Sequence, residues 1–285
     1  MTLGLALAAS LPAQEKEQTG AEKLGWQIAV HSYSFKEFSF DDAIAKTREV
    51  GLNRMSISGS INLHGTKKAA IKTPSLSDKD LAIVKEKLQK GGIVEPFVNM
   101  GVVPLTTNEA QDRQVFEFAK KAGIPILVSE PAIEALDLVE KLCKEYNIKV
   151  ALHNHPEGHS IYWNPEFAMS QITNRSPLIG ICADTGHWVR SGLDPVECLK
   201  KCAGRILVLH FKDLNEKAGK GKKPHDVPWG TGISNARAMM EELKRQNFHG
   251  AFCIEYENNW TTSVPEIAEC VKFFNKTTDE LAKEK

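Results

Sequence analysis

Four apolar segments in the second half of the chain each end in side chains of the types that bind metals. The segments read VALHNH (150–155), GICADTGH (180–187), LVLHFKD (207–213) and FCIEYE (252–257), and they deliver His153, His155, Asp184, His187, His210, Glu255 and Glu257. A parallel strand buried on both faces has no structural need for an imidazole or a carboxylate at its end. One such histidine alone is usually a packing residue, but the same pattern in four segments indicates that their ends meet at one site.

The ligand set favoured by this pattern is His153, Asp184, His210 and Glu255. Two imidazoles with two carboxylates suit Mn²⁺ or Zn²⁺, with Co²⁺ and Fe²⁺ as alternatives, better than Mg²⁺ or Ca²⁺, which prefer oxygen ligands. We therefore expect one divalent metal with an open position for a substrate. Such a metal lowers the cost of removing a proton next to a carbonyl group, because negative charge develops beside the cation.

Several side chains near these ligands are candidates for moving that proton. Glu255 and Glu257 are two residues apart, so a strand would place both on one face. Glu257, His187 and Lys212 are therefore catalytic candidates together with Glu255. Each has a plainer alternative: Glu257 as a solvated rim charge, His187 as a brace for the metal site, and Lys212 as the partner of an ion pair. His155 is either a fifth ligand or a hydrogen-bond donor beside the ligands.

Aromatic side chains follow several of the same segments and suggest a carbohydrate substrate. The substrate-binding candidates are His31, Tyr33, His155, Trp188, Trp229 and Trp260. Rings around an opening offer flat apolar surfaces to the C–H face of a sugar, while their polar edges stay in water. The alternative is that these rings only pack over the ends of the strands.

Short apolar segments alternate with amphipathic ones from residue 26 onward, which predicts βαβ units and a parallel sheet. The expected strands cover 26–31, 54–58, 93–98, 124–129, 149–154, 178–184, 205–210 and 251–256. Eight such units predict an α/β fold, a single (β/α)₈ TIM barrel over 25–283, with the active site at the C-terminal ends of its strands. A doubly wound sheet competes with this fold, but no glycine-rich phosphate turn follows the first strand.

Charge and the N-terminal segment bear on partners and location. The 36 basic and 36 acidic residues cancel, which argues against a polyanion-binding surface, so we expect no nucleic-acid partner. Residues 3–9 (LGLALAA) resemble the apolar core of a secretory signal peptide and are too few to span a bilayer. We therefore interpret 1–20 as a signal peptide and expect a periplasmic or secreted protein without a membrane span. If this segment is instead an unstructured N-terminus, the protein is cytoplasmic.

Four motifs together resemble the xylose-isomerase-like TIM barrel superfamily, often called sugar phosphate isomerases/epimerases. They are Asp-Thr-Gly-His (184–187), His-Phe-Lys-Asp (210–213), Trp-Gly-Thr-Gly (229–232) and Ile-Glu-Tyr-Glu (254–257). The resemblance implies one metal held by Glu, Asp, His and Glu from strands five to eight, and Asp184, His210 and Glu255 match the last three. His153 departs from it, because the family's epimerases carry there one of the two glutamates implied to move the proton. Glu130, at the end of the fourth expected strand, is a candidate for the missing carboxylate.

The function that these observations favour is a metal-dependent sugar isomerase or epimerase that removes a proton next to a carbonyl group. The alternative is a lyase or hydratase that acts on a 3-keto-glycoside or keto-sugar, which export and the missing glutamate favour. An apurinic endonuclease and a non-catalytic carbohydrate-binding protein fit less well, the former because it needs several zinc ions and a basic face. The expected partner is a small carbohydrate, and homo-oligomerisation is left open.

Overall fold

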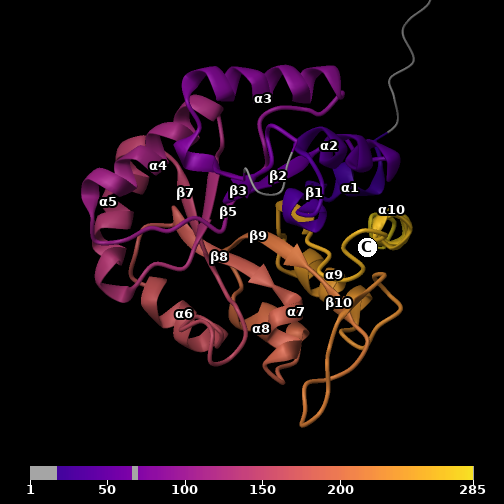
Figure 1. The fold of residues 1–285 in the computed structure, drawn as a ribbon. Coiled ribbons are helices and arrows are strands. Elements are labelled where there is room, and N and C mark those ends of the chain that lie inside the picture. The colour runs from indigo at the N-terminus through magenta and orange to yellow at the C-terminus, as the bar shows by residue number, and fades with distance from the viewer. Residues whose placement is uncertain (1–17, 66–69, 285) are drawn as a thin grey trace, which may run out of the picture.

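A computed structural model describes residues 18–65 and 70–284, and its strands close into a barrel. Eight parallel strands follow the order β1-β12-β9-β8-β7-β6-β5-β2, and helices surround them (Figure 1). The predicted single TIM barrel is confirmed. Apart from residues 18–20, the segment interpreted as a signal peptide lies outside the described residues. Among the described residues, no helix combines the length and the apolar character needed to cross a membrane.

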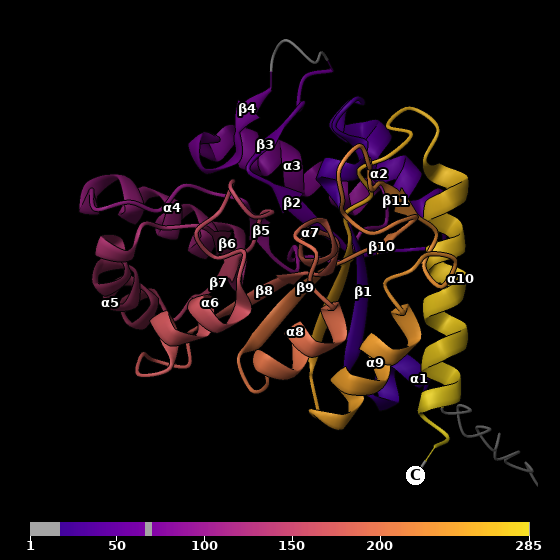
Figure 2. The same ribbon diagram turned by 90° about the horizontal axis from the view of Figure 1, so that it is seen from below.

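The barrel strands and the helices between them have the following bounds. The strands are β1 (Trp26–His31), β2 (Met55–Ser58), β5 (Met100–Gly101), β6 (Ile126–Ser129), β7 (Lys149–His153), β8 (Ile179–Asp184), β9 (Ile206–Phe211) and β12 (Gly250–Ile254). The helices are α1 (Gly20–Lys23), α2 (Phe40–Glu49), α3 (Asp78–Lys90), α4 (Glu109–Ala122), α5 (Leu136–Tyr146), α6 (Pro165–Ile172), α7 (Thr185–Arg190), α8 (Pro195–Lys201), α9 (Ala236–Arg245) and α10 (Val264–Leu281). Figure 2 shows α10 lying along the outside of the barrel next to β1.

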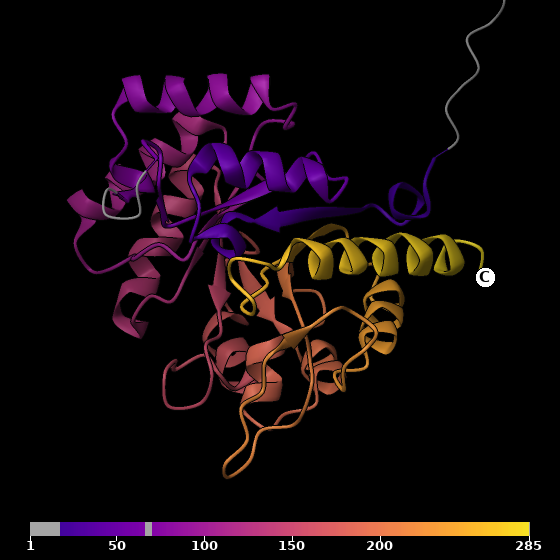
Figure 3. The same ribbon diagram turned by 45° about the vertical axis from the view of Figure 1, so that its right-hand side comes forward.

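Two short antiparallel hairpins interrupt this alternation on the side where the strands end. They pair β3 (Ser60–Ile61) with β4 (Ile71–Lys72), and β10 (Asp213–Leu214) with β11 (Asp226–Val227). The segment between β10 and β11 is the basic, glycine-rich stretch that follows the seventh strand of the barrel. Figure 3 shows it as a loop that extends away from the body of the molecule.

The third strand differs from its expected position. The sequence analysis placed it at 93–98, whereas β5 covers only Met100–Gly101. Pro96 lies inside the expected strand and has no N–H to donate to a ladder, so it is unsuited to a central strand. The apolar character of this segment instead reflects burial, since Ile93, Phe97 and Val98 all belong to the core.

The inside of the barrel is filled by a layer of small side chains. This cluster consists of Ala29, Val98, Val128, Ala151, Cys182, Val208, Ala251 and Cys253. A second and larger apolar cluster, which includes Val30 and Leu152, joins the strands to the surrounding helices. Because alternate residues of a strand face opposite sides, the residue two positions after each member of the inner layer also faces the barrel axis. The candidate site residues His31, Glu130, His153, Asp184, His210 and Glu255 occupy such positions.

Polar side chains join neighbouring strands just past their ends. Thr185 Oγ1 accepts a hydrogen bond from Lys212 N at 2.8 Å and donates to Lys212 O at 2.9 Å, which connects the ends of β8 and β9. Asn154 accepts from Asp184 N and donates to Asp184 O, both at 3.0 Å, and connects β7 to β8. Ser34 connects β1 to β12 through Ile254 O and Tyr256 N. These bonds extend the barrel's pairing to the level at which the candidate site lies.

We expect Thr185→Val to lower the free energy of unfolding by about 1–3 kcal/mol, because the amide and carbonyl of Lys212 lose a buried partner while the side-chain shape is kept. Urea denaturation followed by circular dichroism measures this change. Thr261→Val, at an exposed position, is the matched control and should stay within about 0.5 kcal/mol of the parent. An equal effect of the two substitutions would show that the connection between β8 and β9 contributes nothing measurable.

Candidate active site

The predicted metal ligands meet inside the end of the barrel. Each follows a member of the small-residue layer by two positions: His153 follows Ala151, Asp184 follows Cys182, His210 follows Val208 and Glu255 follows Cys253. One ligand atom from each of these four residues lies within 4.8 Å of the others. The period of the strands thus places four polar groups in one layer above an apolar floor.

The ammonium group of Lys212 lies at the centre of this layer. Its Nζ is 2.9 Å from Asp184 Oδ2, 2.8 Å from Glu255 Oε2 and 2.7 Å from Glu257 Oε2. Burial alone would lower the pKa of Lys212, but the three carboxylates hold it well above its usual value. Burial would raise the pKa of Glu255, and Lys212 with His210 outweighs this and holds it well below the usual range. Three carboxylates thus share one ammonium in a buried space, and negative charge exceeds positive.

Several buried ligand atoms have no hydrogen-bond partner among the described residues. They are His153 Nε2, Asp184 Oδ2 and both ring nitrogens of His210. Asp184 Oδ2 lies close to Lys212 Nζ but outside hydrogen-bond geometry, and His210 Nδ1 lies 3.1 Å from Glu255 Oε2. Unpartnered buried polar atoms are rare in proteins and call for an explanation. Two imidazoles and one carboxylate with free ligand atoms, next to Glu255 and in an excess of negative charge, fit a divalent cation.

Glu130 holds two of the histidines. Its Oε1 lies 2.7 Å from His153 Nδ1 and also contacts His155 Nδ1. Burial opposes the ionised carboxyl group, but the hydrogen bonds from both imidazoles lower the pKa of Glu130 to about 2. Bonding at Nδ1 directs the Nε2 of His153 toward Asp184, 3.7 Å away. Glu130 thus has the position of a carboxylate that orients a metal-binding histidine. It is not one of the four predicted ligands.

A cavity of about 410 Å³ opens over this layer. Its lining includes His31, Tyr33, His153, His155, His187, Glu255 and Glu257. Burial lowers the pKa of His31 to about 3, so this imidazole is neutral, and its Nδ1 lies 2.5 Å from Ser56 Oγ. The sequence analysis named Lys212 as a catalytic candidate that could contact the substrate. Its side chain is 1 % exposed and does not line the cavity. Its contacts are with the carboxylates beneath the opening.

Two of the predicted aromatic surfaces lie elsewhere. Trp188 and Trp229 are 1 % and 2 % exposed and pack in the apolar core, where Trp229 meets Phe211 edge-on with ring centroids 4.7 Å apart. The expectation that these rings face the opening is wrong, because Trp188 in α7 and Trp229 after β11 both pack in the core. Trp260 is half-buried and stands edge-on to Tyr33 at 5.6 Å, so this pair does remain at the end of the barrel.

An ion pair that the sequence analysis missed connects the catalytic candidates to the β10–β11 hairpin. Arg190 Nη2 lies 2.7 Å from Asp226 Oδ1, and Nη1 lies 3.1 Å from Glu257 Oε2 and 3.2 Å from His187 Nδ1. Asp226 Oδ2 also accepts a hydrogen bond from Glu257 N at 2.6 Å. Burial raises the pKa of Asp226 to about 6 against the effect of Lys212 and Arg190. The only sequence signal was that Arg190 lies one helical turn after His187.

We expect Arg190→Met to lower the free energy of unfolding by about 3 kcal/mol, because it leaves the buried carboxylate of Asp226 without its cation. Arg190→Met combined with Asp226→Asn should recover part of this loss, since the second change removes the unpaired charge. Urea denaturation of the two single variants and the double variant gives the coupling energy.

Lys272→Met is the control for this cycle, because Lys272 pairs with Glu269 on the exposed face of α10. It should change stability by no more than about 0.5 kcal/mol. If Arg190→Met cost no more than Lys272→Met, the ion pair would not hold the hairpin to the site.

Comparison with known proteins places this arrangement in a family. The family described as xylose isomerase-like TIM barrel matches residues 59–277, about three quarters of the chain. A structure of an uncharacterised protein from Parabacteroides distasonis is 32% identical, with a TM-score of 0.68 over 88% of this chain and 99% of that one. A xylose isomerase-like TIM barrel protein from Mycobacterium smegmatis in complex with magnesium has a TM-score of 0.71 over 91% of this chain and 99% of that one. At 15% identity, it shows the shared fold alone.

Among curated proteins, the chain is similar to inosose dehydratases. It is 31% identical to the inosose dehydratase of Clostridium tetani over 139 residues, which cover 44% of this chain and 46% of that enzyme. The chain spans about half the length of the curated relatives it matches. The family match covers β5 to β12 and thus every strand that delivers a metal-type ligand. The chain belongs to the xylose isomerase-like TIM barrel family.

Proposed function

We propose that the protein is a divalent-metal-dependent lyase that acts on a keto-sugar or a similar polyhydroxylated ketone. It removes the proton next to the carbonyl group and expels an oxygen substituent from the following carbon. The observation that carries this proposal is that His153 stands where an epimerase would need a carboxylate to transfer a proton on the second side of the substrate. The resemblance to inosose dehydratases over half their length supports the same reaction class.

Epimerisation and elimination make different demands on the site. An epimerase takes a proton from one face of a carbon and returns it to the opposite face, so it needs proton carriers on both sides. Here Asp184, Glu255 and Glu257 all converge on Lys212 Nζ, and the fourth position holds His153, whose Nδ1 is bonded to Glu130. Elimination needs a base for the proton and an acid for the departing oxygen, and both can lie on one side.

The chain's own residues divide the work as follows. His153, Asp184, His210 and Glu255 would hold the cation, which when bound polarises the substrate's carbonyl oxygen as a Lewis acid. Glu257 is the base: it lines the cavity and is held by Lys212 and Arg190. The proton leaves carbon for Glu257, a carbon–carbon double bond forms, and the carbon–oxygen bond at the next carbon breaks. Glu257, protonated by this step, returns the proton to the departing oxygen, and His187, which also lines the cavity, is placed to donate a hydrogen bond to that oxygen.

An epimerase or isomerase is the second candidate, and one observation favours it. His187 and Glu257 both line the cavity and neither belongs to the four-residue ligand cluster, so two proton carriers are available. Incubation with keto-sugars in deuterated water separates the candidates. Elimination gives an unsaturated ketone and a free alcohol or water, whereas epimerisation gives deuterated substrate and its epimer. Absence of α-deuterium and of product from every keto-sugar tested would contradict both.

We expect Asp184→Asn to abolish stoichiometric metal binding in the folded protein. Asparagine keeps the oxygen that accepts the bond from His187 N at the start of α7, so the helix cap survives while the charge is lost. Metal content after dialysis, measured by inductively coupled plasma mass spectrometry, checks this. Asp194→Asn at the start of α8 is the matched control, because Asp194 caps its helix in the same way. Full metal occupancy in Asp184→Asn would refute the assignment.

We expect Glu257→Gln to lower the rate of proton removal by about 10²–10⁴-fold, the usual contribution of a general base. Metal content should be unchanged, because Glu257 is not among the four proposed ligands. The measurement is the initial rate of α-deuterium exchange or of product release with a keto-sugar on which the parent protein shows turnover. Glu269→Gln, on the exposed face of α10, should retain the parent rate. A near-normal rate for Glu257→Gln with metal bound would move the base to His187.

A further inference from the structure

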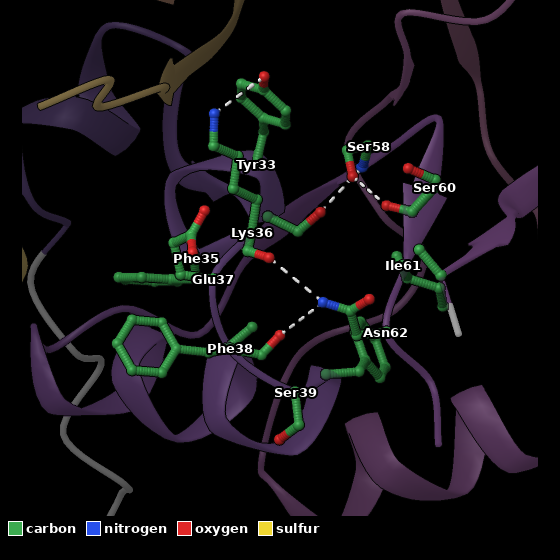
Figure 4. A pocket seen from close by; sticks show the side chains of 14 residues that line it. Tyr33, Phe35, Lys36, Glu37, Phe38, Ser39, Ser58, Ser60, Ile61 and Asn62 are labelled. Atoms are coloured by element: carbon green, nitrogen blue, oxygen red, sulfur yellow. Dashed lines mark hydrogen bonds between the residues drawn. The ribbon is translucent and has the colours of Figure 1, made fainter. Parts of the chain in front are cut away.

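A second cavity adjoins the one over the ligand cluster. It has a volume of about 220 Å³ and lies between the segment after β1, the start of α2 and the β3 strand (Figure 4). Tyr33, Ser58 and Ser60 line both cavities, so the two lie next to each other with these side chains at their common border. Sites for small molecules commonly measure about 300–1,000 Å³, so the first cavity already has room for a monosaccharide and the second adds room for another group.

The lining of this second cavity is suited to a neutral group that carries hydroxyls. Apart from Lys36 and Glu37, the side chains around it are uncharged, and they include Ser32, Ser58, Ser60 and Asn62 together with the partly exposed rings of Tyr33 and Phe38. Serine hydroxyls and an amide both donate and accept hydrogen bonds, and aromatic faces pack against C–H groups. This combination matches a sugar ring rather than a phosphate or a purely apolar chain.

Asn62 provides an unused acceptor at this cavity. Its Nδ2 donates to the backbone oxygens of Lys36 at 3.2 Å and Phe38 at 3.0 Å, as Figure 4 shows. These bonds fix the orientation of the amide group. Its Oδ1 is buried and has no hydrogen-bond partner among the described residues, and the whole residue is only 8 % exposed. A buried acceptor without a donor is costly, and a ligand hydroxyl would supply that donor.

A fixed aromatic wall stands where the two cavities join. Lys36 Nζ donates to Tyr33 Oη at 3.2 Å and lies 3.4 Å from the centre of the Trp260 ring. Trp260 in turn stands edge-on to Tyr33. The charge of Lys36 is therefore engaged at the wall, and Tyr33 is held from two sides. A ligand that extends from the first cavity into the second would pass along this ring.

We propose that the second cavity binds a neutral sugar unit linked through oxygen to the keto-sugar that reacts in the first cavity. The substrate class is then a keto-glycoside with two units rather than a free keto-sugar, an inference that rests on the proposed lyase activity. When the linked unit departs, the α-proton passes to Glu257, a carbon–carbon double bond forms and the linking carbon–oxygen bond breaks. Glu257 returns that proton to the departing oxygen and the second unit leaves as an alcohol, so no oxidant or reductant is consumed.

Two variants test the subsite without touching a residue of the first cavity. Asn62→Ala removes the free acceptor, and Ala43→Met fills the cavity from α2. The substrates are 3-keto-hexoses and 3-keto-disaccharides that share the same reacting unit. We expect the parent to prefer the disaccharides in kcat/KM by about tenfold, roughly the effect of one neutral hydrogen bond. Both variants should lose that preference while their kcat/KM on the single unit stays within about twofold.

Ala110→Met, at an exposed position of α4, is the matched control and should keep the preference. Equal kcat/KM of the parent on one- and two-unit probes, or an equal loss on both in the two variants, would overturn the subsite. The lyase proposal would survive that result, because it requires only turnover of the single unit. Calorimetric titration with the unoxidised hexoses and disaccharides measures the subsite without turnover. Tighter binding of disaccharides, lost in Ala43→Met, is expected, and equal binding would contradict the inference.

Discussion

Lys212 carries one positive charge into a space where three strand-end carboxylates converge. Its ammonium group lies within 3 Å of Asp184, Glu255 and Glu257, and its side chain is almost fully buried. Removing charges from water is costly unless their partners are held in place, so the geometry of β8, β9 and β12 has to be maintained at this level. The position of the proposed base and the positions of two proposed metal ligands depend on this contact. A lysine that touches no substrate therefore organises the residues that would.

The rest of the barrel end supports that arrangement in two ways. Side chains such as Thr185, Asn154 and Ser34 bond across strand ends and continue the pairing where the ladder stops. Arg190 and Asp226 also hold Glu257 and connect it to the β10–β11 hairpin. Each of these side chains makes at least two hydrogen bonds, which fixes its orientation as well as its distance from its partners. Such a frame suits chemistry in which a proton has to be taken from a defined position.

Much of this site could be predicted because strand period and barrel topology together bring strand ends to one face. His153, Asp184, His210 and Glu255 follow directly from that rule, and they do cluster. The rule fails for side chains whose position depends on the path of the chain after the strand. Trp188 and Trp229 follow strands yet pack in the core. Pro96 argued against a strand at 93–98, but the sequence analysis gave more weight to the apolar residues of that segment. Arg190 and Asp226 lie 36 residues apart without a shared motif, so only the fold brings them together.

The base of the β10–β11 hairpin is bonded to the candidate site, whereas its loop extends away from the body of the molecule (Figure 3). Asp213 and Asp226 at its base bond to the turn 230–234 and to Glu257, and Asn215 N donates to His225 O, which closes the base of the loop. In the part of the chain that the structure describes, the basic side chains beyond this closure do not contact the ligand cluster. Insertions at the tip should therefore be tolerated, as they are at other exposed loop tips. The same position offers a place to attach a reporter or an additional domain without moving the chemistry.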